Sequence, residues 1–444
     1  MSFHRIVNRE FLSLDIRQVA LLLLMVFLLQ SQPVCAEEPL PSPLTLEYAL
    51  GLADHAHPER SLAEADLAQA RALSEQVEAD DDMRLSLTAE LRVIEPSEIA
   101  VYDSRNDSLA RLNLSKRLYD FGRTSHAQEA AEAGLASRQW QLLQVRQQRR
   151  LNVMARFFDV LLADLEFARD NEALSIDYIR FDRARTRNEL GKVSDVDMLE
   201  LEATYQQALR RMTASRNRQR ITRSQLAISL NRPLDLPAEL ESPQFEPLAE
   251  LPEIEELVEK ALRENPKRKL LQAELHAATK QLQASEAEDN PVLRAELQAA
   301  TYQRELGGRN PLTAALVFEL PLYQGNRVMS GIAEQRAIVN RKQAELAAYE
   351  LKLRQQLLDY WMELDRLKVE REGLLVTGDF RDLYLDRSRT LYELDMAADL
   401  GDSMSQIADV QLQRARNDYQ IQLTHARIKA LTGDLLSSPE HKNE

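Results

Sequence analysis

The stretch Asn113–Arg123 reads NLSKRLYDFGR, and the similar stretch FELPLYQGNR occupies Phe318–Arg327. In both, a segment of alternating apolar and polar residues ends in Leu-Tyr, and a Gly and an Arg lead into a long stretch rich in Ala and Gln. Alternation with a period of two indicates a β-strand. We therefore expect a strand to pass directly into a long helix twice in this chain, at Gly122 and at Gly325.

Proline placement outlines these helices. The chain has no Pro between Pro96 and Pro233 or between Pro321 and Pro439, whereas five prolines crowd into residues 233–252. A Pro in a helix interior costs about 3 kcal/mol. The two Pro-free stretches can therefore form long helices, and residues 233–252 are expected to be a crossover between them.

Apolar residues in both Pro-free stretches follow a heptad spacing, over 151–168 in the first and 353–367 in the second. Such a narrow seam is typical of coiled coils rather than of globular helices. Gly191 supplies a helix stop in the first stretch, and a second reversal is expected near residue 397. The spacing therefore predicts two helical hairpins.

Two strand-like segments precede each hairpin, and each is apolar on one face and polar on the other. The expected strand pairs are 84–94 with 109–118 and 292–301 with 312–322. The hairpins repeat after 204 positions, and HAHPE at His55 recurs as RENPK at Arg263, 208 positions later. We expect two structural repeats, each with a helix, a strand pair and a helical hairpin. They span residues 37–232 and 253–436.

The N-terminus has the features of an export signal. Arginines precede the apolar run Val19–Leu29, which is too short to span a bilayer as a helix, and small residues end the segment at Ala36. Residues 1–36 are therefore predicted to be a signal peptide that carries away the chain's one cysteine, Cys35. Residues 437–444 are expected to form a disordered tail.

Composition argues against several functions. The formal net charge of -15 disfavours nucleic acid as a partner. The sequence contains no dinucleotide-binding, P-loop or nucleophile-elbow motif, and its seven histidines are scattered. We expect neither an enzyme nor a cofactor or metal site.

The strand pattern leaves two alternatives open. An antiparallel sheet with one wet face alternates in this way, and so does a transmembrane barrel. Four strands do not close a barrel, and open sheet edges are not tolerated in lipid. A barrel would therefore need strands from several chains, and its continuation into a ring of helices would form a tunnel.

Four motifs in order resemble the TolC-like outer-membrane efflux proteins, over about Leu44 to Leu436: LTLEYALGLADHAHPE, RLYDFGR, NELGKVSDVDMLELEATYQQA and LPLYQGNR. The resemblance implies a mainly α fold with a small β part: long antiparallel coiled-coil hairpins and four β-strands per chain. It implies a homotrimer that shares a twelve-stranded barrel in contact with outer-membrane lipid. It also implies a large periplasmic part, which includes the Pro-rich crossover 233–252. Its implied function is a passive exit duct in the Gram-negative outer membrane, for efflux or type I secretion. The implied partners are a periplasmic adaptor and an inner-membrane pump of the RND, ABC or MFS type.

The resemblance also implies that the hairpin tips dock the adaptor. The corresponding residues are Gly191, Lys192, Val193 and Ser194 in the first tip and Met396, Ala397 and Ala398 in the second. The second tip departs from the family pattern, because YELDMAAD has no Gly at the turn. Its fit to an adaptor is therefore less well defined than that of the first tip.

Carboxylates near the tips are candidates for a periplasmic gate, because an inward-facing acid repeated around a threefold axis forms a ring that favours cations. Asp399 and Asp402 are the first candidates, and Asp195 and Asp197 are the second. The alternative for the same residues is helix capping, which contributes about 1 kcal/mol.

A periplasmic coiled-coil adaptor without a barrel is the alternative function. Adaptors normally have one hairpin beside Gly-rich β-domains, whereas this chain has only 12 Gly and a duplicated strand pair. The sequence does not indicate the cargo.

Overall fold

The computed structural model describes residues 40–436 apart from 56, 98, 100–103, 236–237, 246–251, 305–308 and 395–399. The chain divides into two units, of which the second, Ser42–Glu444, contains every helix and strand described. The predicted signal peptide 1–36 and tail 437–444 lie outside the described residues. The second-tip residues Met396, Ala397, Ala398 and Asp399 also lie outside them.

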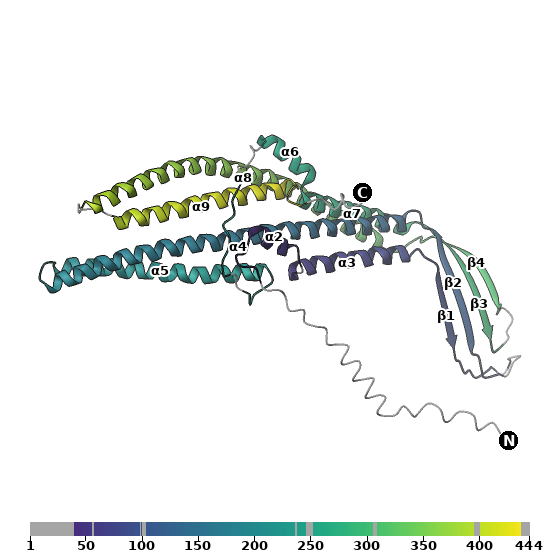
Figure 1. The fold of residues 1–444 in the computed structure, drawn as a ribbon. Helices are drawn as coiled ribbons and strands as arrows, with labels where there is room; N and C mark the ends of the chain where they lie inside the picture. Colours follow the sequence, from purple (N-terminus) through teal and green to yellow (C-terminus); the bar gives the residue numbers. More distant parts are fainter. Residues whose placement is uncertain are drawn as a thin grey trace, which may run out of the picture. The chain divides into compact units, whose positions relative to one another are not determined.

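The two halves of the second unit have the same order of elements (Figure 1). The first half contains α2 (Leu46–Ala53), α3 (Pro58–Ala79), β1 (Arg84–Glu90), β2 (Leu109–Tyr119), α4 (Arg123–Glu189) and α5 (Asp195–Ser229). The second contains α6 (Ile254–Glu264), α7 (Pro266–Glu286), the 3-10 turn η1 (Ala287–Asp289), β3 (Val292–Tyr302), β4 (Leu312–Glu319), α8 (Arg327–Glu393) and α9 (Leu400–Leu431). Both α4 and α8 have 67 residues. The predicted internal repeat of the fold is confirmed.

The strand-to-helix joints are built on glycine. Gly122 and Gly325 have φ angles of 95° and 64°, a left-handed backbone that other residues adopt only under strain. At the first joint the Asp120 carboxylate accepts a hydrogen bond from the Thr124 amide at 3.0 Å, in the first turn of α4. The turn and the helix start are therefore encoded together in the short motif LYDFGR.

Within the described residues the strands form one antiparallel sheet in the order β1-β2-β3-β4, and the β2–β3 pairing joins the two repeats. The register aligns residues of one kind in rows across the sheet. One row is polar, and the row beside it is apolar. The polar row contains Ser86, Asn113, Gln298 and Thr313, and the apolar row contains Leu85, Leu114, Leu297 and Ala314.

Two strands end earlier than the sequence predicts. Strand β1 ends at Glu90 rather than at residue 94, because the Arg92 amide donates to the Ser108 hydroxyl at 3.2 Å in place of a backbone carbonyl. Strand β4 ends at Glu319 rather than at residue 322, since Pro321 has no N–H for the ladder.

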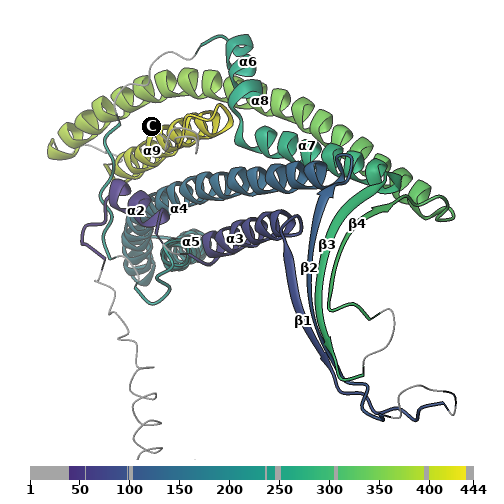
Figure 2. The ribbon, with the colours of Figure 1, turned by 90° about the vertical axis from the view of Figure 1, so that its right-hand side faces the viewer.

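The helices continue the order of the strands. Nearest the sheet, α3, α4, α7 and α8 pack in that sequence, and farther from it the order is α5, α4, α9 and α8 (Figures 1 and 2). A core cluster, Leu353, Leu357, Leu364 and Leu367 among others, joins α8 to α6 and α9. Among the described helices, none combines the length and the apolar character needed to cross a bilayer.

Candidate functional site

The sheet carries exposed apolar side chains on a surface that no other described element covers. Leu87 is 72% exposed, and Leu85, Leu312, Leu316 and Phe318 are similarly open. Strands β1 and β4 each pair with a single neighbour, so the sheet has two unpaired edges within the described chain. A sheet with an open apolar face and open edges is incomplete in water.

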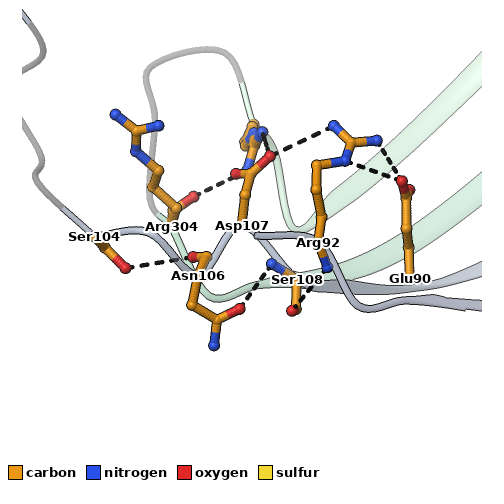
Figure 3. A network of polar contacts seen from close by, with 8 residues as sticks. Glu90, Arg92, Ser104, Asn106, Asp107, Ser108 and Arg304 are labelled. Atoms are coloured by element: carbon orange, nitrogen blue, oxygen red, sulfur yellow. Dashed lines mark hydrogen bonds and ion pairs between the residues drawn. The ribbon is translucent and has the colours of Figure 1, made fainter. Parts of the chain in front are cut away.

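A network of ion pairs lies at the end of the sheet farthest from the helices (Figure 3). Its centre is Asp107, which is only 3% exposed. Arg309, from the connection between β3 and β4, donates to both Asp107 oxygens at 2.7 and 3.2 Å, and Arg92 lies 3.5 Å away on the β1–β2 connection. The hydrogen bond from Arg309 lowers the pKa of Asp107. The network therefore ties together the outer connections of the two repeats.

The first tip is a closed turn. Gly191 has a φ of 70°, its amide donates to the Asn188 carbonyl, and the Lys192 amide donates to the Arg187 carbonyl, as in a Schellman motif. Val193 belongs to the same connection, between α4 and α5. Glycine is required here because the backbone is left-handed.

Both acids of the first tip are held by local hydrogen bonds. The Ser194 hydroxyl accepts from the Asp197 amide at 3.1 Å and donates to the Asp197 carboxylate at 2.8 Å. Asp195 accepts from the Asn188 side-chain amide at 2.8 Å. The contacts with Ser194 fit the capping alternative for Asp197, whereas Asp195 is held across the turn by Asn188.

Asp402, in the first turn of α9, contacts the other hairpin. Its carboxylate accepts from the Arg180 guanidinium of α4 at 2.8 Å. Farther along the same interface, Asp409 of α9 pairs with Arg169 of α4 at 3.1 Å. A row of ion pairs therefore joins the two hairpins near their tips. Asp399, the other first candidate, lies outside the described residues.

The two hairpins also pack closely beside this ion pair. A Cβ at Gly401 would lie 3.0 Å from the Ile176 side chain of α4. Within the second hairpin, the Ser403 and Ser388 hydroxyls hydrogen-bond at 3.0 Å in the buried contact between α8 and α9. The sequence reasoning missed Arg180 because its partner is 222 positions away. In the described part of the chain, no three His, Cys, Asp or Glu side chains gather as a metal site would require.

Comparison with known proteins identifies the fold. No family model and no curated protein sequence matches the chain. The CmeC outer membrane channel of Campylobacter jejuni is similar in structure, with a TM-score of 0.73 and 12% identity over 89% of this chain and 86% of that chain. For the outer membrane protein VceC of Vibrio cholerae the TM-score is 0.70 and the identity 16%, over 87% of this chain and 96% of that chain. For the open state of the MtrE outer membrane channel of Neisseria gonorrhoeae the TM-score is 0.68 and the identity 18%, over 88% of this chain and 89% of that chain. The chain therefore has the TolC-like fold of outer membrane channels.

Proposed function

We propose that this protein is an outer-membrane exit duct, a passive tunnel for substrates delivered by an inner-membrane pump. One observation carries the proposal: an open four-stranded sheet, apolar on one face and polar on the other, continues directly into two helices of 67 residues each. In a membrane the apolar face would meet lipid and the polar face would line water.

The sheet edges support assembly from several copies. Pairing β4 of one copy with β1 of the next would satisfy both edges, as a bilayer requires. Such head-to-tail pairing closes a ring when the rotation per copy fits. Three copies would give the twelve-stranded barrel that the family resemblance implies, continued by a ring of helices.

Side chains near the joints fit a membrane boundary. Tyr119, Phe121 and Tyr323 are exposed where the strands meet the helices. Lys116, which aligns with the apolar residues of its strand, bends its amine to the Asp81 carbonyl. Exposed aromatic rings and a snorkelling lysine are typical of the interface between lipid and water. The helices would then begin in the periplasm.

At the far end of the helices, we assign the gate to the contact between Arg180 and Asp402, which would have to break for the hairpins to separate. The tips Gly191–Ser194 and 396–398 are the proposed docking points for the periplasmic adaptor. The pump, of RND, ABC or MFS type, would act through that adaptor.

Cell fractionation followed by bilayer recording tests the proposed function. The full chain should enter the outer membrane, purify in mild detergent as a trimer and conduct ions in planar bilayers. A soluble monomer obtained without detergent would contradict the proposal and favour the adaptor alternative.

A further inference from the structure

Helix α8 has two apolar seams on opposite faces. One is buried in the core, and it includes Leu353 and Leu367. The other is exposed, with side chains 42% to 72% accessible. It consists of Leu358, Met362, Val369, Val376, Phe380 and Leu383. These positions are separated by 4, 7, 7, 4 and 3 residues, so they share one face of the helix. An exposed apolar seam of this length is the mark of an interface.

Helix α5 has an exposed face made of smaller residues. Its opposite face, which includes Ala208 and Leu226, is buried. The exposed face carries Leu199, Ala203, Ala214, Ile221 and Ile228. Small side chains alternating with apolar ones accept the larger side chains of a partner helix. The two helices lie on opposite sides of the helix layer, so these faces do not meet within one copy (Figures 1 and 2).

The two faces also have opposite charge. Residues 203–234 contain seven arginines and no acidic residue, although the chain as a whole has a charge of -15. The exposed ones on α5 are Arg210, Arg211, Arg216, Arg218 and Arg220. The exposed seam of α8 is flanked by acids at every seventh position: Asp365, Glu372, Asp379 and Asp386. A row of acids facing an arginine-rich surface favours this partner over one of like charge.

The internal repeat indicates which residues of the two faces lie at the same distance along the helix layer. Arg218 of α5 contacts Glu166 of α4 at 3.4 Å, and the counterpart of Glu166 in the second repeat, 204 positions later, is Glu370 of α8. Because α4 and α8 have equal length, Arg218 and Glu370 lie at about the same height along the layer. Ile221 is then level with Val369 to within one helical turn.

The same register matches the other residues of the two faces. In an antiparallel packing, residue numbers rise along α8 while they fall along α5. Counting in both directions from Val369 beside Ile221 therefore pairs residues of the two seams and brings charged residues of the two helices close together. Val376 is then level with Ala214, and Met362 is level with Ile228. Glu372 and Arg216, and likewise Asp379 and Arg210, lie within one helical turn of each other. A single register therefore satisfies both the apolar and the charged positions.

We propose that α8 of one copy packs antiparallel against α5 of the next copy, with Val369 beside Ile221 and Glu372 beside Arg216. The inference rests on the proposed ring of copies and names the contact that closes its periplasmic part. The acidic row of α8 favours the arginine-rich surface of α5, and the apolar seams set the register.

Cysteine cross-linking tests this contact. In a Cys35→Ser background, Ile221→Cys with Val369→Cys should link neighbouring copies into a covalent trimer on oxidation, because opposed seam residues meet the distance requirement of a disulfide. The matched control, Ile221→Cys with Val376→Cys, places the cysteines one heptad apart, about 10 Å along the helix. That control should stay unlinked.

Charge reversal gives an independent readout. Glu372→Arg should lower the temperature at which the trimer dissociates in detergent, and adding Arg216→Glu should restore it. An intact trimer in which the 221/369 pair does not link, or the displaced pair links equally well, would overturn the proposed contact and leave the exit-duct function standing. A monomer in the membrane extract would overturn both.

Discussion

Arg149 is a buried cation at a position where the repeat would place an apolar residue. Its side chain is 3% exposed, whereas its counterpart 204 positions later, Leu353, is fully buried in the core. The Arg149 Nε donates to the Ala53 carbonyl at the end of α2. Within the described chain, neither terminal nitrogen has a hydrogen-bond partner. Burial lowers the pKa of Arg149, and the nearby Asp54 carboxylate opposes this shift.

We therefore predict that Arg149→Leu is tolerated. A buried charge that lacks partners can be replaced by an apolar side chain with a gain of about 1 kcal/mol, even after the contact to Ala53 is lost. Thermal denaturation of the purified protein measures this change. Leu353→Ala serves as the control and should cost about 2–5 kcal/mol. A marked loss of stability in Arg149→Leu would contradict the prediction, since it would mean that the charge is compensated in the assembled protein.

Tyr349 joins three helices through a partly buried hydrogen bond. Its hydroxyl, on α8, donates to the Asn265 side chain at 2.9 Å. The Asn265 side chain in turn donates to the Leu431 carbonyl at the end of α9 and accepts from the Arg268 amide at the start of α7. Burial raises the pKa of Tyr349 to about 12. The folded state therefore keeps its proton at pH values at which the unfolded chain, with a pKa of about 10, loses it.

We predict that Tyr349 contributes to alkaline unfolding. Its contribution is fully present below pH 10 and is lost as the pH rises towards 12, by about 1.4 kcal/mol per pH unit. Tyr349→Phe should lose about 1 kcal/mol at pH 7 and should unfold less steeply above pH 10. The free energies of unfolding of both proteins between pH 8 and 12 provide the measurement. Parallel curves would show that Tyr349 does not titrate in this range.

At the scale of elements, the contact between α4 and α9 gives the gate prediction. Arg180 and Asp402 are both partly exposed, so one pair contributes about 0–1 kcal/mol, small enough to open and close reversibly. Asp402→Asn and Arg180→Gln should each increase the open probability of single channels. The exchange Arg180→Asp with Asp402→Arg should restore gating. Asp195→Asn and Asp197→Asn, which alter local contacts of the first tip, serve as controls and should affect stability alone.

The gate prediction is contradicted if Arg180→Gln channels gate as the unaltered protein does. Equal effects of the first-tip variants and of Asp402→Asn on open probability would also contradict it. In that case the first tip, rather than the contact between hairpins, would control opening.

The tips carry a separate prediction about the adaptor. Val193 lies in the turn of the first hairpin, and its replacement by Asp should place a charge where a partner surface would have to dock. Val193→Asp and Ala397→Asp together should abolish export, while the amount of trimer in the membrane stays constant. Export assays with quantified trimer test this. Unchanged export in the double variant would show that the adaptor binds elsewhere.

The elements were predictable because their signals are local. Proline spacing, period-two segments and Gly191 define helices, strands and the first turn within short windows of sequence. The early end of β1 was not predictable, because the Ser108 hydroxyl replaces a backbone acceptor from across the connection. Arg180 was missed for a similar reason, since the packing of two separate hairpins creates its contact with Asp402.

At the scale of the whole molecule, the open surfaces form two continuous flanks. On one side they run along β1, α3 and α5, and on the other along β4 and α8. Each flank carries an unpaired sheet edge and an exposed apolar helix seam. The proposed ring of copies would cover both flanks, and it would supply both the barrel and the tunnel of the proposed function.

The alternating rows of the sheet give the prediction that tests this ring in the membrane. Leu297 belongs to an apolar row and its neighbour Gln298 to a polar row near the middle of β3. In the proposed barrel Leu297→Arg puts a charge into lipid, at a cost of about 2–4 kcal/mol per chain, whereas Gln298→Arg puts it into the water-filled lumen. Leu297→Arg should therefore deplete the outer-membrane trimer. Gln298→Arg should leave its amount unchanged and reduce its preference for cations. Equal depletion by both variants would mean that the two faces of the sheet do not meet lipid and water.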